Sequence, residues 1–227
     1  MTINSIVEKA VTEGRTLLFE DEGGALLREA GIPVNRCLVA ADEAGAIAAA
    51  QEVGFPVVLK VRSAAIAHKT DVGGVKLGLA DPAAVSAAYK EIMEKVSSID
   101  GAAQVTVQAM APPGVELFIG MTTEPQFGPV MAFGLGGTFL ELFKDTTFRL
   151  IPLQEKDAAD MLTAIKGSKI LEGYRGQPPV DKEALKGMLL SLSKVVESTP
   201  QIKEIDLNPV FAYPDGALAV DARIVLF

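Results

Sequence analysis

The chain has 227 residues, of which 49% are hydrophobic, and a formal net charge of −8. A chain of this size can bury the core of one large or two small domains. Its acidity argues against nucleic acid or an anionic membrane as the main partner, and no apolar run reaches the ~18 residues of a membrane span. No secretory signal is visible, and the single cysteine, Cys37, fits a reducing compartment, so we expect a cytoplasmic protein.

Helical and extended patterns alternate along the chain. The sequence predicts a helix over 20–31, whose end is marked by Gly31 with Pro33 beyond it, and an N-terminal helix is assigned to residues 1–27. Asp42 and Asp81 are the expected N-caps of two later helices, and Pro82 suits the first helical position. The sequence predicts helices over 42–53, 82–96, 155–165 and 181–197, and strands over 33–40, 55–61, 74–79, 104–109, 115–123, 128–135, 201–211 and 217–226.

Helices and strands that interleave without a strict period are typical of an α+β or α/β fold. The segment "MAPPGV" at 110–115 is the best candidate for an internal boundary, because its prolines and glycine cannot continue a regular element.

Lys60 lies inside the apolar strand "PVVLKVR". Strand alternation places it on one face with Val58 and Arg62. A charge there must reach water or meet an anion. Lys60 is therefore either an edge lysine or, with Ser63 and the loop beyond it, part of a phosphate-binding site.

The C-terminal segment predicts a β-hairpin with Asp215-Gly216 as its two-residue turn. In that register Asn208 faces Arg223, and Asp206, Asn208 and Asp221 share one face. Two carboxylates and an amide oxygen suit Mg²⁺ bridged to phosphates. The alternative is a solvated face on which Arg223 neutralises the acids.

His68 is the only histidine, in the polar, glycine-marked loop "AHKTDVGGVKLGL" at 67–79. Taken by itself, a lone histidine is more often an ordinary residue than a functional one. A second glycine-rich segment, "FGPVMAFGLGGTFLELFKDTTFRLIPL", allows close backbone approach and carries Asp145 and Arg149, but glycine clusters often serve only turns.

Four segments together resemble the ATP-grasp domain of nucleoside-diphosphate-forming acyl-CoA synthetases. They are "GFPVVLKVRSAAIAHKTDVGGVKLGL", "VQAMAPPGVELFIGMTTEPQFGPVMAFGLGGTFLEL", "GYRGQPPVD" and "EIDLNPV". The chain is most similar to the β subunit of ADP-forming acetate–CoA ligases and more distantly to that of succinyl-CoA synthetase. The resemblance runs in order from about residue 16 to the end.

This resemblance implies a role for each residue already singled out. Lys60 and Ser63 would bind nucleotide phosphates, and His68 would accept a phosphoryl group on a moving loop. The resemblance also implies a hinge strand that meets adenine, formed by Gln108, Ala109 and Met110, and a ribose contact from Glu116. Asp206 would steady the phosphohistidine, and Asn208 and Asp221 would be Mg²⁺ ligands.

The implied fold is a single ATP-grasp domain over 1–227, in which two α+β subdomains clasp ATP or ADP with Mg²⁺. The smaller, lid-like subdomain would comprise residues 28–107 and the larger one residues 108–227, with the N-terminal helix packed near the larger. The implied reaction is acyl-CoA + ADP + phosphate ⇌ acid + CoA + ATP through a phosphohistidine relay.

In the family, the acyl-CoA site lies on a separate α-type subunit or a fused domain. The chain would therefore be the nucleotide-binding half of a hetero-oligomer, of the type α2β2. Two other functions stay open at this point: a ligase that makes an acyl phosphate directly, without a phosphohistidine, and a non-catalytic nucleotide-sensing module.

Overall fold

The computed structural model describes residues 2–66, 68–137 and 145–227. Its contacts divide the chain into two compact units. The large unit comprises Met1–Leu18, Ala25–Val34 and Pro113–Phe227, and the small unit comprises Phe19–Gly24 and Asn35–Pro112. The expected smaller subdomain, 28–107, overlaps most of the small unit, which also takes in the first turn of helix α2.

The large unit is built on an antiparallel sheet with strand order β10-β8-β5-β6-β7, to which β9 adds by pairing with β8. Its strands are β5 (Val115–Glu124), β6 (Gly128–Leu135), β7 (Thr146–Leu150), β8 (Ile202–Tyr213), β9 (Gly216–Ala219) and β10 (Ala222–Leu226). Its helices are α1 (Ile3–Thr12), the end of α2 (Glu20–Glu29), α6 (Glu155–Ala164), the 3-10 helix η1 (Ser168–Glu172) and α7 (Lys182–Ser198).

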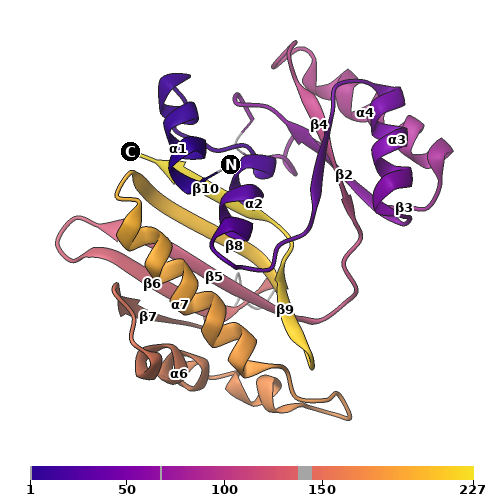
Figure 1. The fold of residues 1–227 in the computed structure, drawn as a ribbon. Coiled ribbons are helices and arrows are strands. Elements are labelled where there is room, and N and C mark those ends of the chain that lie inside the picture. The colour runs from indigo at the N-terminus through magenta and orange to yellow at the C-terminus, as the bar shows by residue number, and fades with distance from the viewer. Residues whose placement is uncertain (1, 67, 138–144) are drawn as a thin grey trace. The chain divides into compact units, whose positions relative to one another are not determined.

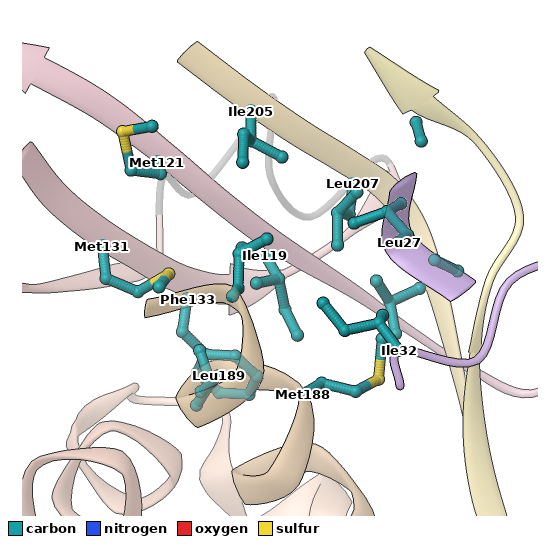
Figure 2. Close-up of a cluster of buried hydrophobic side chains, with 14 of the residues drawn as sticks. Leu27, Ile32, Ile119, Met121, Met131, Phe133, Met188, Leu189, Ile205 and Leu207 are labelled. Carbon is teal, nitrogen blue, oxygen red and sulfur yellow. The ribbon is translucent and has the colours of Figure 1, made fainter. Parts of the chain in front are cut away.

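The helices of the large unit cover one face of this sheet. Alternate residues of β5 and β8, among them Ile119, Met121, Ile205 and Leu207, point into the core that they share with α7. Figure 2 shows these side chains beside Met188 and Leu189 of α7 and Leu27 of α2. Since strand side chains alternate, the residues between them lie on the opposite face of the sheet.

The small unit has a four-stranded antiparallel sheet with strand order β1-β4-β2-β3. The strands are β1 (Cys37–Ala40), β2 (Val57–Arg62), β3 (Val75–Leu79) and β4 (Gln104–Ala109), and the helices are α3 (Glu43–Val53) and α4 (Pro82–Val96). Both helices lie on one side of the sheet (Figure 1). They bury Val57, Leu59 and Val61 of β2, so Lys60 points to the other side.

Most predicted elements are confirmed by the structure. Strands 104–109 and 128–135 and helix 82–96 have the predicted bounds. The side chain of Asp42 accepts a hydrogen bond from the N–H of Gly45, and that of Asp81 from the N–H of Ala84, so both are N-caps as predicted. These elements are set by local signals, namely caps, proline and strand alternation.

Two predictions about secondary structure are wrong, and two elements were missed. The helix predicted over 20–31 is confirmed as α2, but residues 1–27 are not one helix, because the chain leaves the helical conformation of α1 at Gly14, whose φ is +70°. The strand 217–226 is interrupted between Ala219 and Ala222. Strand β7 and helix η1 were not predicted.

No helix within the described parts of the chain is long and apolar enough to cross a membrane. Residues 138–144, which belong to the second glycine-rich segment, lie outside the described residues.

We expect Gly187→Ala to raise the free energy of unfolding by about 0.5–1 kcal/mol, because alanine costs less conformational entropy than glycine inside a helix. Gly187 is exposed within α7, and an added Cβ meets nothing within 4 Å. Chemical denaturation measures the change. The matched control is Gly78→Ala, which has equally open space but a φ of +68° and should lower stability. Equal effects at both positions would contradict this account.

Candidate active site

Lys60 is buried, and its charge is balanced by the carboxylate of Glu20. The Lys60 Nζ lies 2.5 Å from Glu20 Oε1, and each side chain is only 6% exposed. Strand β2 is an interior strand, between β4 and β3, so the edge-lysine interpretation is wrong. Lys60 therefore meets the anion that its burial requires.

Two further side chains bind the same carboxylate. Gln108 Nε2 donates to Glu20 Oε1 at 2.5 Å, and Lys69 Nζ lies 2.5 Å from Glu20 Oε2. Val58 pairs with Gln108 across β2 and β4, and Lys60 pairs with Thr106, so these side chains project from one face of the sheet. We call Glu20, Lys60, Lys69 and Gln108 the Glu20 cluster.

A second ion pair lies next to the Glu20 cluster. Arg62, two residues beyond Lys60 on the same face, donates from Nε to Asp21 Oδ1 at 2.7 Å and from Nη2 to Oδ2 at 3.2 Å. Its guanidinium also stacks 3.8 Å from the centroid of the Phe19 ring. These contacts fix the start of α2 over the polar face of the small sheet.

The loop that carries His68 is anchored on its C-terminal side. His68 is exposed. The N–H of Gly74 donates to the Lys69 carbonyl at 2.8 Å, and the Gly74 carbonyl accepts from Val61 N–H of β2 at 2.7 Å. A Cβ at position 74 would lie 2.9 Å from the Lys69 carbonyl oxygen and would clash with the Val61 side chain. Only glycine allows this approach, so the glycine pair holds the loop to the sheet.

Ser63 is buried, but its hydroxyl is already engaged. Its Oγ donates to Asp100 Oδ2 at 2.6 Å and accepts from Ala65 N–H at 3.1 Å. The hydrogen bonds from Ser63 and from the N–H of Ala102 hold the pKa of Asp100 below its ordinary value. A phosphate contact at Ser63 would therefore come from the backbone or require this hydroxyl to leave Asp100.

The expected hinge strand is the end of β4 and the residue after it. The Gln108 side chain is buried in the Glu20 cluster, whereas Met110 is 41% exposed. The Ala109 carbonyl accepts from Asn35 Nδ2 at 3.1 Å, and Met110 N–H donates to the Pro56 carbonyl at 2.9 Å. These bonds hold the segment in an extended conformation.

Glu116 lies near the start of β5, in the large unit, and is exposed. It lines a cavity of about 620 Å³ whose wall includes Val115, Tyr174 and Tyr213. Its carboxylate closely approaches Gly137, where an added Cβ would collide with Glu116 Oε2. The cavity is within the usual range of about 300–1,000 Å³ for small-molecule sites.

The polar patch of the C-terminal strands exists, in a corrected register. Arg223 pairs with Asp206, not with Asn208 as expected, and Ala222 pairs with Leu207. The turn contains Pro214 and Asp215, since Tyr213 pairs with Gly216. Proline favours the first central position of a β-turn, so the turn is centred one residue earlier than expected. Each residue of one strand therefore pairs with a partner two positions away from the expected one. An even shift leaves every side chain on its expected face.

The carboxylate of Asp206 is half-buried in this patch. Burial raises its pKa above the ordinary value. Arg223 acts in the opposite direction, whereas the negative charges of Asp221 and Glu204 raise it further. Within the described part of the chain, its Oδ1 is buried without a hydrogen-bond partner. Arg223 Nη1 pairs instead with Glu204 Oε1 at 2.5 Å, so it does not fully neutralise the patch.

The residues of the patch fit a magnesium ion. Mg²⁺ takes oxygen ligands, commonly one or two carboxylates together with substrate phosphates, and the buried Oδ1 of Asp206 is an acceptor that lacks a donor. One oxygen of Asp221 accepts from Ala222 N–H at 3.0 Å. Across residues 2–66, 68–137 and 145–227, no three His, Cys, Asp or Glu side chains form a complete metal cluster, so the ion would depend on Asn208 and the nucleotide.

The chain matches the ATP-grasp domain family over residues 9–226. It is 42% identical over 224 residues to the β subunit of acetate–CoA ligase (ADP-forming) I of Pyrococcus furiosus, covering 97% of this chain and 96% of the relative. It is 45% identical over 210 residues to acetate–CoA ligase (ADP-forming) II of Archaeoglobus fulgidus. That match covers 92% of this chain but 30% of the longer relative.

Solved structures agree with these matches. A structure of acetyl-coenzyme A synthetase 1 from Ca. Korarchaeum cryptofilum, with coenzyme A, Ca-AMPCP and HgCl+, superposes with a TM-score of 0.94 at 46% identity over 99% of both chains. Another structure contains coenzyme A and Mg-AMPPCP, with its phosphohistidine segment pointing towards the nucleotide binding site. Its TM-score is 0.87 at 45% identity, over 99% of this chain and 100% of the other.

The chain therefore belongs to the ATP-grasp family, and within it to the branch of ADP-forming acetate–CoA ligase β subunits. This confirms both the resemblance and the ATP-grasp fold that the sequence predicts. The comparisons do not assign the roles of single residues, which stay proposals.

The sequence did not reveal Glu20 and Lys69 as neighbours of Lys60. Glu20 is 40 residues from Lys60 and 88 from Gln108. The available signal was indirect: a lysine in an interior strand needs an anion, and the start of α2 carries three acids, Glu20, Asp21 and Glu22. Strand order and helix placement, which decide which acid is used, were not predictable from local patterns.

The thiol of Cys37 is expected to react slowly with iodoacetamide, because the thiolate is the reactive form. Burial, and then the negative charge of Glu20, raises the pKa of Cys37 from 9.0 to about 11. Two pKa units lower the thiolate fraction at pH 8 by about 100-fold. Intact-mass measurement of alkylation should show this difference between the folded chain and the chain unfolded in urea. Equal rates would contradict the buried, acidic surroundings.

Proposed function

We propose that this chain is the nucleotide-binding and phosphoryl-transfer subunit of an ADP-forming acyl-CoA synthetase. The reaction is acyl-CoA + ADP + phosphate ⇌ acid + CoA + ATP. The relatives in Pyrococcus furiosus and Archaeoglobus fulgidus are ADP-forming acetate–CoA ligases, and this chain spans nearly the whole of the former.

The observation that carries the proposal is the Glu20 cluster beside the exposed His68. A buried lysine on an interior strand is suited to neutralising phosphate charge. Lys60 Nζ lies 2.5 Å from Glu20 Oε1, and Gln108 Nε2 donates to the same oxygen at 2.5 Å. His68 directly precedes Lys69 of the same cluster. The chain thus offers a phosphate-binding cation and an imidazole from adjoining segments.

In the proposed step an imidazole nitrogen of His68 attacks the γ-phosphorus of ATP. The nitrogen–phosphorus bond forms as the bond from phosphorus to the bridging oxygen breaks, and ADP leaves with that electron pair. Positioning and charge neutralisation contribute most of the catalysis in such transfers. Lys60 stabilises the phosphate charge, and Asp206 accepts the other imidazole N–H and so fixes which nitrogen attacks.

The remaining site residues bind the nucleotide. Asn208 and Asp221 would hold Mg²⁺, which would neutralise charge on the phosphate oxygens. Glu116 accepts hydrogen bonds from the ribose hydroxyls. Gln108, Ala109 and Met110 meet the adenine, and the backbone of the Ser63 loop meets phosphate.

The acyl-CoA site is proposed to lie on an α-type partner, in an α2β2 assembly. In Archaeoglobus fulgidus the matching region makes up 30% of a longer chain, whereas the matching Pyrococcus furiosus relative is a β subunit. We also propose a cytoplasmic location, since a single cysteine suits a reducing compartment.

His68→Asn is expected to abolish phosphoryl incorporation from Mg–ATP, by more than 100-fold, because asparagine has no comparable nucleophilic nitrogen. Radiolabelled γ-phosphate measures it, and the product should be acid-labile and alkali-stable. The exposure of His68 predicts an unchanged fold.

Thr70→Ala, an exposed change in the same loop, is the matched control and should retain incorporation. If His68→Asn supports acid–CoA ligation with the partner at the wild-type rate, the phosphohistidine is ruled out, and direct acyl phosphate formation is favoured.

Asp221→Ala is expected to weaken Mg²⁺-dependent ADP binding at least tenfold, about 1.4 kcal/mol, by removing a charged metal ligand. Calorimetry with and without Mg²⁺ measures this, and circular dichroism checks the fold. Asp215→Ala, at the exposed turn of the same strands, is the charge-matched control. Normal Mg–ADP affinity in the Asp221 variant would show that the ion is held elsewhere.

A further inference from the structure

The carboxylate of Glu20 connects three segments of the proposed active site. Oε1 binds Lys60 of β2 and Gln108 of β4, each at 2.5 Å, and Oε2 binds Lys69 of the His68 loop at 2.5 Å. The two carboxylate oxygens therefore serve different segments. Glu20 itself is only 8% exposed. The family relationship reported above assigns no function to this residue.

We propose that Glu20 is a positioning residue, which fixes Lys60 for the nucleotide phosphates and ties down the His68 loop through Lys69. The inference rests on the proposed function for the roles of Lys60 and His68. It adds a residue that touches neither the phosphates nor the reacting nitrogen, and that acts through the two lysines.

The charges of the cluster support this role. One carboxylate faces two ammonium groups, so the cluster of Glu20, Lys60 and Lys69 keeps one net positive charge. If Lys60 and Glu20 were alone, the pair would be neutral and would attract phosphate weakly. Lys69 restores the positive charge, while Glu20 spares Lys60 the cost of burial without a counter-ion.

The geometry ties His68 to the same carboxylate. Consecutive Cα atoms are about 3.8 Å apart, so fixing Lys69 restricts where His68 can lie. The backbone of Lys69 is also held by Gly74, whose N–H donates to its carbonyl at 2.8 Å. Side chain and backbone of Lys69 are thus both anchored, and Glu20 supplies the side-chain anchor.

Glu20 is not needed to start its helix, because a neighbour does so. Glu22 Oε2 accepts from the N–H of Phe19 at 3.1 Å, at the beginning of α2. Asp21 pairs with Arg62. Each acid of this first turn thus has its own partner, and the partners of Glu20 are the ones that belong to the proposed site.

The first test needs no catalytic assay. Trypsin must accept the Lys69 side chain in its own pocket, so the ion pair with Glu20 should protect the Lys69–Thr70 bond. We expect Glu20→Gln to speed cleavage there at least tenfold, with cleavage after Lys156 of the same chain as the internal reference. Asp21→Asn, which removes the same charge one residue later, should leave cleavage unchanged. An unchanged rate at Lys69 in Glu20→Gln overturns the tether.

The second test separates positioning from stability. In Glu20→Gln the cluster gains positive charge, so the Kd for Mg–ATP should stay the same or fall, while phosphorylation of His68 at saturating ATP slows at least tenfold. A purely structural role would instead reduce the number of nucleotide-binding sites and the phosphorylation rate together, in proportion to the folded fraction. Loss of nucleotide affinity in a fully folded variant, or a wild-type rate, counts against the proposal.

Lys69→Met keeps the test decisive if Glu20→Gln does not fold, since it leaves the Glu20–Lys60 pair in place. It should also slow phosphorylation, and the double variant should be no slower than Glu20→Gln alone. Wild-type phosphorylation in Lys69→Met refutes the tether. If the wild-type chain itself is never phosphorylated at His68, the proposed function fails, and the digestion result alone decides the role of Glu20.

Discussion

Burying one ammonium group is the constraint on which the small unit depends. Lys60 stands in an interior strand with helices on the opposite face, and an unpaired charge there would cost several kcal/mol. The chain meets this cost by bringing the first turn of α2 onto the polar face of the sheet. Asp21 of the same turn pairs with Arg62, so two ion pairs join the start of α2 to strand β2.

The large unit separates its two faces in a simpler way. Alternation along β5 and β8 sends Ile119, Leu207 and their neighbours into the core beneath α7, and leaves Asp206 and Asn208 on the other face. A stable sheet thus presents polar groups without any special backbone. This is why the corrected register did not alter the chemistry expected of the patch: a slip of two residues preserves the face, whereas a slip of one would have buried the acids.

Local signals in the sequence were sufficient for most elements, and long-range choices were not. Asp81 with Pro82 determines the start of α4, and the β-branched run of Val105, Thr106 and Val107 identifies β4. The break between α1 and α2 depends on Gly14, a weak signal within a helical pattern. The partner of Lys60 depends on which helix start reaches the sheet, and no periodicity records that. Strand alternation singled out Lys60 and the polar patch of Asp206, Asn208 and Asp221, whereas the adenine and ribose residues came from the family resemblance alone.

The exposure and uniqueness of His68 have a practical consequence for spectroscopy. The chain contains one histidine, so its proton spectrum holds a single pair of imidazole C–H signals, with no second imidazole to confuse their assignment. Because the ring is exposed, these signals should be narrow in the unlabelled protein. Nucleotide, metal and partner subunit can each be titrated while one loop is observed directly, without isotopes or an introduced probe.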